Sequence, residues 1–189
     1  MSLSIHNIKL SLKIPCIDLQ SLEKAFLGNK KKVFRNFFCV SDSGYNYVFF
    51  KHRSLDKNPT KQHINVTSIK QFDDISNVID NLCAKINILP KELSYKIDNI
   101  SAKLILNHPL DIEKFQFINQ DLKLQYNIEK FPGVFVKKGL QTDPNAKKAT
   151  FILFASGKIN IVGVQSLEIL EKSAQWITQR CAPILNLIA

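Results

Sequence analysis

The sequence has few glycines, few cysteines and no long apolar run. Its 189 residues include only 6 Gly, 4 Cys, 1 Met and 1 Trp. The cysteines lie far apart without a Cys-x-x-Cys pair, which excludes a zinc ribbon or thioredoxin-like motif. No run approaches the roughly 18 apolar residues that a membrane span needs. No signal-peptide pattern opens the chain, which favours an intracellular protein.

Chemistry-bearing residues are scattered along the chain. The histidines His6, His52, His63 and His108 show neither metal-ligand nor catalytic-triad spacing. The few glycines form no phosphate-cradling loop. The sequence therefore predicts no enzyme, no metal and no cofactor.

The charge balance is strongly basic. Lys and Arg total 26 against 16 Asp and Glu, a net charge of +10, and only three of the bases are Arg. Residues 1–95 carry 14 bases and 8 acids, and residues 96–189 carry 12 and 8. Such a surplus favours a polyanionic partner, of which nucleic acid is the commonest, although a merely soluble basic domain is the alternative.

One pattern occurs twice. Ile5-His-Asn-Ile is matched by Ile97-Asp-Asn-Ile, an Asp suited to cap a helix follows at Asp18 and Asp111, and residues 63–68 resemble residues 158–163. The offsets are 92, 93 and 95 residues. Three matches in one order indicate a duplication. We predict repeats at residues 1–93 and 94–189 that form one structural unit.

Each half is predicted to fold as strand, short helix, several strands and long helix. β-type runs occur at residues 33–40, 45–50, 133–136 and 150–154. The buried faces of the two long helices comprise Ile75, Val78, Ile79, Leu82, Cys83 and Ile86, and Leu167, Leu170, Ala174, Ile177 and Cys181, with Pro183 predicted to end the second. The fold class is therefore α+β, an antiparallel sheet with all long helices on one face and the other face open.

The second half resembles the TATA-box-binding protein family. The residues that carry the resemblance are Phe131-Pro-Gly-Val, then Phe151-Ile-Leu-Phe-Ala-Ser-Gly-Lys-Ile, then Gly163, together with Ile97-Asp-Asn-Ile. The first half is a weaker match. The resemblance implies a saddle, in which two pseudo-symmetric repeats share a curved ten-stranded sheet with helices on its convex face. Its concave face would bind the DNA minor groove.

In that family, two pairs of phenylalanines wedge between base steps and kink the duplex. The positions that match are Phe131 and Phe154 in the second half, and Phe50 and Phe34 in the first. Phe37 and Phe38 are the alternatives to Phe34. Because Phe131 and Phe154 adjoin turn residues and lysines, they are poorly placed for a core.

The resemblance also implies groove and phosphate contacts. Asn7 and Asn99 match the family's symmetric asparagines, whose amides can donate to adenine N3 and thymine O2. The remaining groove-facing positions are Asn65, Asn160, Thr67 and Val162, and the phosphate-binding positions are Lys137, Lys148 and Lys158. Bases around the first phenylalanine pair are Lys30, Lys31, Lys32, Arg35, Lys51, Arg53, Lys57 and Lys61.

Several residues depart from the family pattern. Asn65, Asn160, Lys9 and Ser101 replace valines, and Val162 replaces a threonine, so the groove-facing surface is unusually polar. Two segments, 51–61 and 138–147, are insertions.

The same pattern bears on protein partners. Glu129 matches an acidic contact to transcription factor IIB, whereas its acidic companion is replaced by Asn127. The helix that opens at Gln71 lacks the basic run that contacts transcription factor IIA, so that partnership is not predicted.

Two functions follow as hypotheses. The first is a general transcription initiation factor that binds and bends A·T-rich double-stranded promoter DNA, with a transcription factor IIB-like protein and RNA polymerase as partners. Its location would be the nucleus, or the cytoplasmic factory or virion of a large DNA virus. The alternative is a family relative that serves as a protein–protein assembly module in a transcription complex, with weak or no DNA binding.

Overall fold

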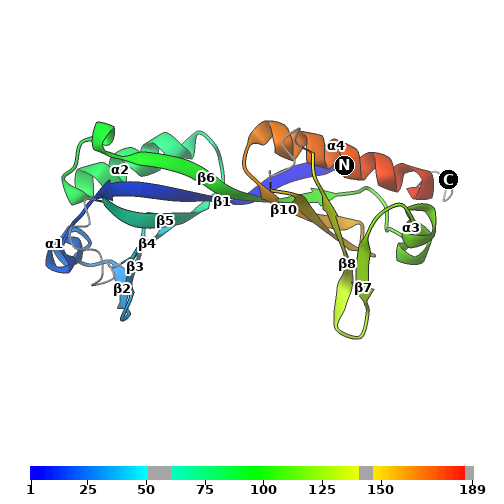
Figure 1. The fold of residues 1–189 in the computed structure, drawn as a ribbon, viewed down its shortest axis with the longest axis horizontal. Coiled ribbons are helices and arrows are strands. Elements are labelled where there is room, and N and C mark those ends of the chain that lie inside the picture. The colour runs from blue at the N-terminus through cyan, green and yellow to red at the C-terminus, as the bar shows by residue number, and fades with distance from the viewer. Residues whose placement is uncertain (51–60, 141–146, 186–189) are drawn as a thin grey trace. The chain divides into compact units, whose positions relative to one another are not determined.

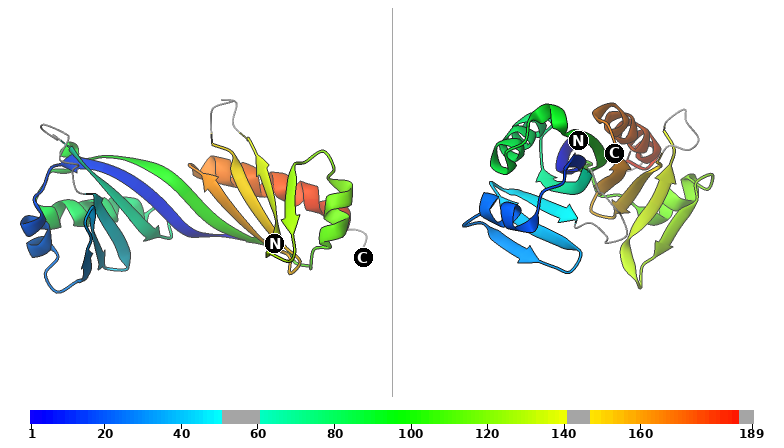
Figure 2. Two further views of the ribbon diagram at one scale, coloured as in Figure 1. Left: turned by 60° about the horizontal axis from the view of Figure 1, so that its bottom comes forward. Right: turned by 60° about the vertical axis from the view of Figure 1, so that its left-hand side comes forward.

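A computed structural model describes residues 1–50, 61–140 and 147–185, and in these the chain forms ten antiparallel strands and four α-helices (Figure 1). The strand order in the sheet is β2-β3-β4-β5-β1-β6-β10-β9-β8-β7. The chain divides into two compact units, which we call the N-unit (Asn7–Asp98) and the C-unit (Met1–His6 with Asn99–Ala189). Strands β1 and β6 contribute residues to both units and run side by side (Figure 2).

The N-unit contains the elements of the first half. They are β1 (Ser2–Pro15), α1 (Leu19–Ala25), β2 (Lys30–Val33), β3 (Phe37–Asp42), β4 (Tyr45–Phe50), β5 (Lys61–Ile69), α2 (Asp74–Ile86), the short 3₁₀ turn η1 (Pro90–Glu92) and the start of β6 (Ser94–Ile105).

The C-unit repeats this order. After β6 come α3 (Ile112–Ile118), β7 (Leu124–Asn127), β8 (Phe131–Lys138), β9 (Ala149–Phe154), β10 (Lys158–Val164) and α4 (Leu167–Leu185). The sheet pairs strands by antiparallel ladders throughout, as in Gly133↔Phe154 between β8 and β9.

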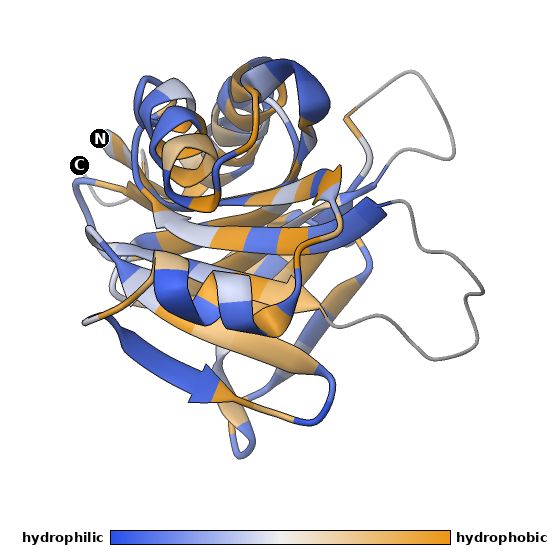
Figure 3. Cartoon of the chain, turned by 90° about the vertical axis from the view of Figure 1, so that its left-hand side faces the viewer, coloured by the Kyte–Doolittle hydropathy of each residue, from blue (hydrophilic) through white to orange (hydrophobic). Residues whose placement is uncertain are grey.

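Side chains of a strand alternate between two faces, and here one face is buried and the other open. In β1, Leu10 and Leu12 are fully buried, whereas Ser11 between them is half-buried. In β10, Ile159 and Ile161 alternate in the same way with Asn160. Figure 3 shows the alternation as blue and orange bands along the strands.

Helices cover the buried face of each unit. The ring of Phe26, which ends α1, lies 5.8 Å from the buried ring of Tyr47 in β4. In the C-unit, the Trp176 ring of α4 lies 5.1 Å from the buried ring of Phe151 in β9. None of the described helices covers the opposite face within either unit (Figure 1), and we call that face the open face.

The predicted helix signals are confirmed. Asp18 and Asp111 each accept a hydrogen bond from the backbone N–H three residues on, which caps α1 and α3. All six predicted residues of α2 are buried. Cys181 is fully buried in α4, and burial raises the pKa of its thiol to about 12.

Two details of α4 differ from the prediction. Leu167 is 43% exposed, because helical side chains point toward the amino end and the first residue projects past the helix. The helix also continues two residues beyond Pro183. Proline within a last turn removes only one main-chain hydrogen bond, so the helix does not end there.

The predicted run at residues 33–40 is wrong as a single strand. A turn at Phe34–Asn36 separates β2 from β3, and the Phe34 N–H donates to the carbonyl of Phe37. Strands β2 and β7 were not predicted, because their lysines and polar residues give no apolar alternation.

The compact units do not coincide with the predicted repeats. Residues 1–6 belong to the C-unit, although the sequence repeat places them in the first half. The division at 93 and 94 describes the duplicated sequence and stays a prediction.

A buried ion pair links helix and sheet in the N-unit. The Asp42 carboxylate of β3 lies 2.7 Å from Lys85 Nζ of α2 and accepts a 2.8 Å hydrogen bond from Asn29. Burial raises the pKa of Asp42, but the hydrogen bonds from Lys85 and Asn29 outweigh it, so the pKa lies below its ordinary value of 3.8.

We expect Lys85→Met to lower the free energy of unfolding by about 1–3 kcal/mol at pH 7, because it leaves a buried carboxylate without its charged partner. Since the folded pKa of Asp42 is depressed, its stabilisation is present above 3.8 and lost as the pH falls through the folded value. Urea unfolding of the wild type and the variant at pH 7 and pH 3 measures the loss of stability and its dependence on pH. The control Lys172→Met breaks an exposed pair with Glu168 and should cost much less, because water screens exposed charges. If Lys85→Met and Lys172→Met lost equal amounts of unfolding free energy, the pair between Asp42 and Lys85 would not stabilise the fold more than an exposed pair does.

Candidate nucleic-acid interface

Cross-strand neighbours define the open face of the N-unit. The register pairs Lys32 with Cys39, Cys39 with Val48, Val48 with Asn65 and Asn65 with Ser11. Directly opposed residues share a face, so these five side chains form one row across the sheet.

The C-unit has the corresponding row. Asn160 of β10 pairs with Lys103 and Ile152, and Ile152 pairs with Phe135. Asn65 and Asn160 therefore occupy matching positions. Thr67 and Val162 follow two residues further along β5 and β10, and both are half-buried. The four predicted groove residues thus lie on the open faces.

Asn7 and Asn99 lie at matching irregularities of the two ladders. The Asn7 Oδ1 accepts a 2.6 Å hydrogen bond from the Ser68 N–H, and the Asn99 Oδ1 accepts a 2.6 Å bond from the Gly163 N–H. Ser68 and Gly163 have φ angles of 74° and 88°. The pairing register shifts at this point in both units, between Ile8 and Leu10 and between Ile161 and Val164.

These contacts fix the direction of both amides. A backbone N–H only donates, so the carboxamide oxygen must face it and the NH₂ group must face away. In Asn99, the Nδ2 also donates to the Ser101 hydroxyl at 3.0 Å. An NH₂ group has two N–H bonds, so each asparagine can act as a donor toward a ligand on the open face.

The C-unit presents an aromatic pair at the end of its open face. The rings of Phe131 and Phe154 lie 5.8 Å apart in an edge-to-face arrangement, and Phe131 is 38% exposed. A Cβ on Gly133 would lie 2.7 Å from Phe131 Cε1 and 3.2 Å from Phe154 Cε1. Glycine at this position therefore makes room for both rings. Lys158 Nζ lies 5.9 Å from the centre of the Phe154 ring.

Both units have three neighbouring rings at this end, but the rings occupy different positions. In the C-unit the third ring is Phe135, 5.1 Å from Phe131, whereas the N-unit rings are Phe34, Phe37 and Phe50. Phe34 stacks on Phe37 at 4.5 Å, and Phe37 lies 6.4 Å from Phe50. Phe37 pairs with Phe50 as Gly133 pairs with Phe154, so a ring replaces the glycine. Phe38 is fully buried, which removes it as an alternative and leaves Phe34 and Phe37.

The predicted phosphate-binding lysines are exposed. Lys137, Lys148 and Lys158 all have exposed side chains on or beside β8, β9 and β10. In the N-unit, Lys30, Lys31 and Lys32 form β2 and line a hollow of about 390 Å³. Lys51, Arg53 and Lys57 lie outside the described residues, as do most of the insertion at 51–61 and residues 141–146 of the other insertion.

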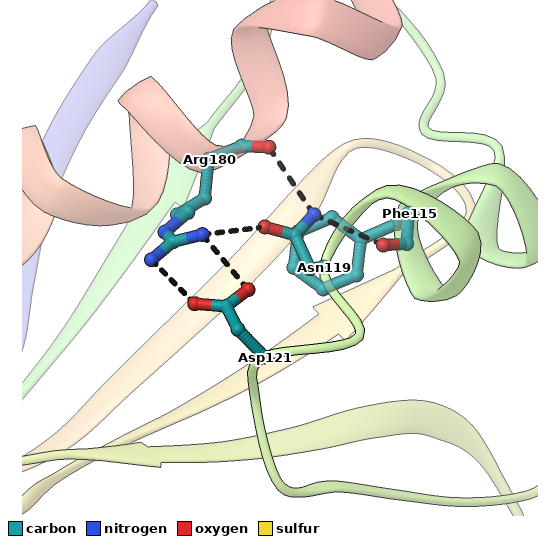
Figure 4. Close-up of polar contacts among 4 residues, drawn as sticks. All are labelled: Phe115, Asn119, Asp121 and Arg180. Carbon is teal, nitrogen blue, oxygen red and sulfur yellow. Dashed lines mark hydrogen bonds and ion pairs between the residues drawn. The ribbon is translucent and has the colours of Figure 1, made fainter.

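A polar network fixes the segment that leads into the β7–β8 hairpin (Figure 4). Arg180 of α4 donates to both carboxylate oxygens of Asp121, at 2.8 and 3.0 Å. The buried Asn119 donates to the Phe115 carbonyl at 2.9 Å. This anchor joins α4 to the start of a hairpin whose turn carries the exposed Glu129.

Sequence reasoning missed several residues of the open face. Phe135, Ile152 and Lys103 were not singled out, because each matches an ordinary strand residue until the ladder register is known. A hollow of about 260 Å³ in the C-unit brings His6 close to Lys158, Asn160 and Val162.

Neither metal nor membrane features are found within the described ranges. No group of three His, Cys, Asp or Glu there could hold a metal ion. None of the helices described is both long and apolar enough to span a membrane.

Comparison with known proteins agrees with this geometry. The family model of transcription factor TFIID, or TATA-binding protein, matches residues 94–186. TATA-box-binding protein 1 of Methanosarcina acetivorans is 25% identical over 187 residues, which are 95% of this chain and 94% of that protein. The chain belongs to the TATA-binding protein family.

Other comparisons extend this result. The TATA-box-binding protein of Pyrococcus horikoshii is 33% identical over 85 residues, covering 45% of this chain and 40% of that protein. The solved structure of Methanococcus jannaschii TBP covers 97% of this chain with a TM-score of 0.74 at 19% identity. The expected α+β fold of the family is therefore confirmed, and family membership confirms that the chain is not an enzyme.

Ser68 has a positive φ angle at the position where the C-unit has Gly163, so its backbone should be strained. Glycine accepts a positive φ without cost, whereas a residue with a Cβ pays roughly 1 kcal/mol or more. Ser68→Gly should therefore be more stable than Ser68→Ala by about 1 kcal/mol in urea unfolding. Both variants lose the hydrogen bond from Asn46 to the Ser68 hydroxyl, so the comparison isolates strain. An alanine variant as stable as the glycine variant would show that Ser68 does not hold this conformation.

Proposed function

We propose that this protein binds duplex DNA in the minor groove through its open faces and bends it as a transcription initiation factor. The observation that carries the proposal is the matched pair of asparagines. In each unit a backbone N–H holds the amide oxygen, so the NH₂ group is available to a ligand. A·T pairs present only acceptors in the minor groove, and amide donors complement them.

Four rings support bending, three of them exposed and Phe154 half-buried. Phe131 and Phe154 lie at one end of the C-unit open face, and Phe34 and Phe50 lie at one end of the N-unit open face. A ring can replace the stacking that a base step loses when it opens. Exposed aromatic rings otherwise leave apolar area in water, so a ligand that covers them lowers the free energy.

Charge supports a nucleic-acid ligand. The chain carries a net charge of +10, the side chains of Lys137, Lys148 and Lys158 are exposed, and Lys158 lies beside the Phe154 ring. Each phosphate contact releases counterions, so binding should weaken as the salt concentration rises.

The proposal also covers the DNA site and the protein partners. The repeats at 1–93 and 94–189 would contact successive parts of an A·T-rich promoter. Glu129, exposed in the β7–β8 turn, would contact a transcription factor IIB-like protein that recruits RNA polymerase. Such a factor would act in the nucleus or in the factory of a large DNA virus.

One observation favours the second function, a protein-assembly module. Lys9, Ser11, Asn65 and Asn160 make the open faces polar, and a protein surface could satisfy these groups as well as DNA could. DNA binding that is weak and independent of sequence would favour this alternative.

Phe131 and Phe154 provide the direct test of bending. Because unstacking a base step costs a few kcal/mol, replacing both rings with Ala should abolish bending while lysine-driven attachment survives. Energy transfer between dyes at the two ends of a duplex measures the bend, and a thermal melt checks the fold. Phe117→Ala, which removes an exposed ring from α3, is the control and should bend DNA normally. Unchanged bending by a folded double variant would rule out wedging by this pair.

Asn7 and Asn99 test base readout. Asn99→Asp keeps the oxygen that faces the Gly163 N–H but replaces the donor with an acceptor, so the local structure should persist. We expect A·T-rich binding to weaken by about 5- to 100-fold, and Asn7→Asp to behave alike. Asn77→Asp on exposed α2 is the charge-matched control. Titration by fluorescence anisotropy decides the matter, since equal losses in all three variants would indicate only a charge effect.

A further inference from the structure

The N-unit open face holds a cluster of oxygen atoms that the proposed function does not explain. The Ser11 hydroxyl of β1 is hydrogen-bonded to the Asp98 carboxylate of β6 and lies 3.1 Å from Asn65 Oδ1 of β5. We call these three residues the acceptor cluster. Ser11 also lines a hollow of about 440 Å³ together with His63 and Lys96.

The positions of the Ser11 hydroxyl proton and the Asn65 amide protons determine which acceptors the cluster offers to a ligand. A hydroxyl has one proton, and a carboxylate is a stronger acceptor than an amide oxygen, so Ser11 donates to Asp98. The Asn65 amide is then satisfied when its NH₂ group donates to the Ser11 oxygen. The two orientations of an amide have the same shape, and the hydrogen-bond network selects between them. We therefore place the Asn65 NH₂ group at the position 3.1 Å from Ser11, which reverses the orientation in the structure, so that the Asn65 oxygen faces away from Ser11.

Two lysines keep Asp98 ionised. Lys96 Nζ lies 3.2 Å and Lys9 Nζ 3.9 Å from the carboxylate oxygens. Burial raises the pKa of Asp98, but hydrogen bonds from Ser11 and Lys96 and the charges of both lysines lower it overall. At neutral pH, Asp98 is therefore an acceptor only, and the neighbouring lysines offset its repulsion of DNA phosphates.

The C-unit lacks a corresponding cluster among its described residues. Lys103 pairs with Asn160 where Ser11 pairs with Asn65, and His6 precedes Asn7 where Asp98 precedes Asn99. One unit thus presents acceptors at this level of the sheet, and the other presents a lysine ammonium group, which only donates.

We propose that the acceptor cluster binds the N2 amino group of guanine, so that the DNA site contains a G·C pair beneath the N-unit. The N2 amino group is the one donor in the minor groove, and it alone separates G·C from A·T there. This inference rests on the proposed minor-groove binding. It also gives the DNA site a direction, because the C-unit would still favour A·T pairs.

Inosine provides the test, because it pairs with cytosine and differs from guanine only by lacking the N2 amino group. A series of A·T-rich duplexes would carry one G·C or one I·C pair, stepped along the site. Fluorescence anisotropy of the full chain gives the ratio of the two affinities at each position. We expect G·C to bind about 5- to 100-fold more tightly than I·C at one position, and equally or more weakly elsewhere.

Variants then assign that position to the cluster. Asp98→Ala should bring the ratio close to one, and Ser11→Ala should reduce it. Asp80→Ala removes the same charge from the exposed surface of α2 and should keep the wild-type ratio. Changes in overall charge cancel in the ratio, because they affect both duplexes alike.

The outcomes separate this inference from the proposed function. Duplex binding with no position that prefers G·C over I·C would overturn the inference and leave minor-groove binding standing. A preference that survives in Asp98→Ala would also overturn it. Failure to bind any duplex would overturn the proposed function and this inference with it.

Discussion

Burial of one sheet face beneath helices is the constraint on which the rest of this structure depends. Because strand side chains alternate, covering Leu10, Leu12 and Ile64 necessarily places Ser11, His63 and Asn65 on the other face. The apolar residues supply the stability, since each fully buried Leu or Ile contributes roughly 1.5–3 kcal/mol. The open face is thereby freed from folding requirements and can carry polar residues, exposed rings and lysines.

Duplication gives the two units the same local devices, and divergence makes them differ. Both retain an asparagine held by a positive-φ residue, Asn7 by Ser68 and Asn99 by Gly163. The rings differ, because Phe37 stands where the C-unit has Gly133. Phe131 and Phe154 meet edge to face beside Gly133, whereas Phe34 stacks on Phe37 beside Phe50, so the two ends would deform a duplex differently.

Polar replacements change what the open face can recognise. Valine offers only shape and apolar contact, whereas an asparagine, a serine or a carboxylate requires a matched partner once it is covered. A surface with Asn65, Ser11 and Asp98 therefore gains selectivity at the cost of desolvation. Ligands without complementary groups are penalised, which narrows the set of sequences or surfaces that bind tightly.

The sequence alone determined much of this fold, for identifiable reasons. Period-3.6 stripes located α2 and α4, the capping aspartates located α1 and α3, and the repeated Ile-x-Asn-Ile located β1 and β6. These signals are local, so they survive without tertiary information. Tertiary structure alone decided which of Phe34, Phe37 and Phe38 are exposed, because Phe34 lies in the turn before β3 and the two neighbours Phe37 and Phe38 lie on opposite faces of the sheet. It also decided that Asp98 lies against Ser11, since residues 87 positions apart in the chain meet only through strand pairing.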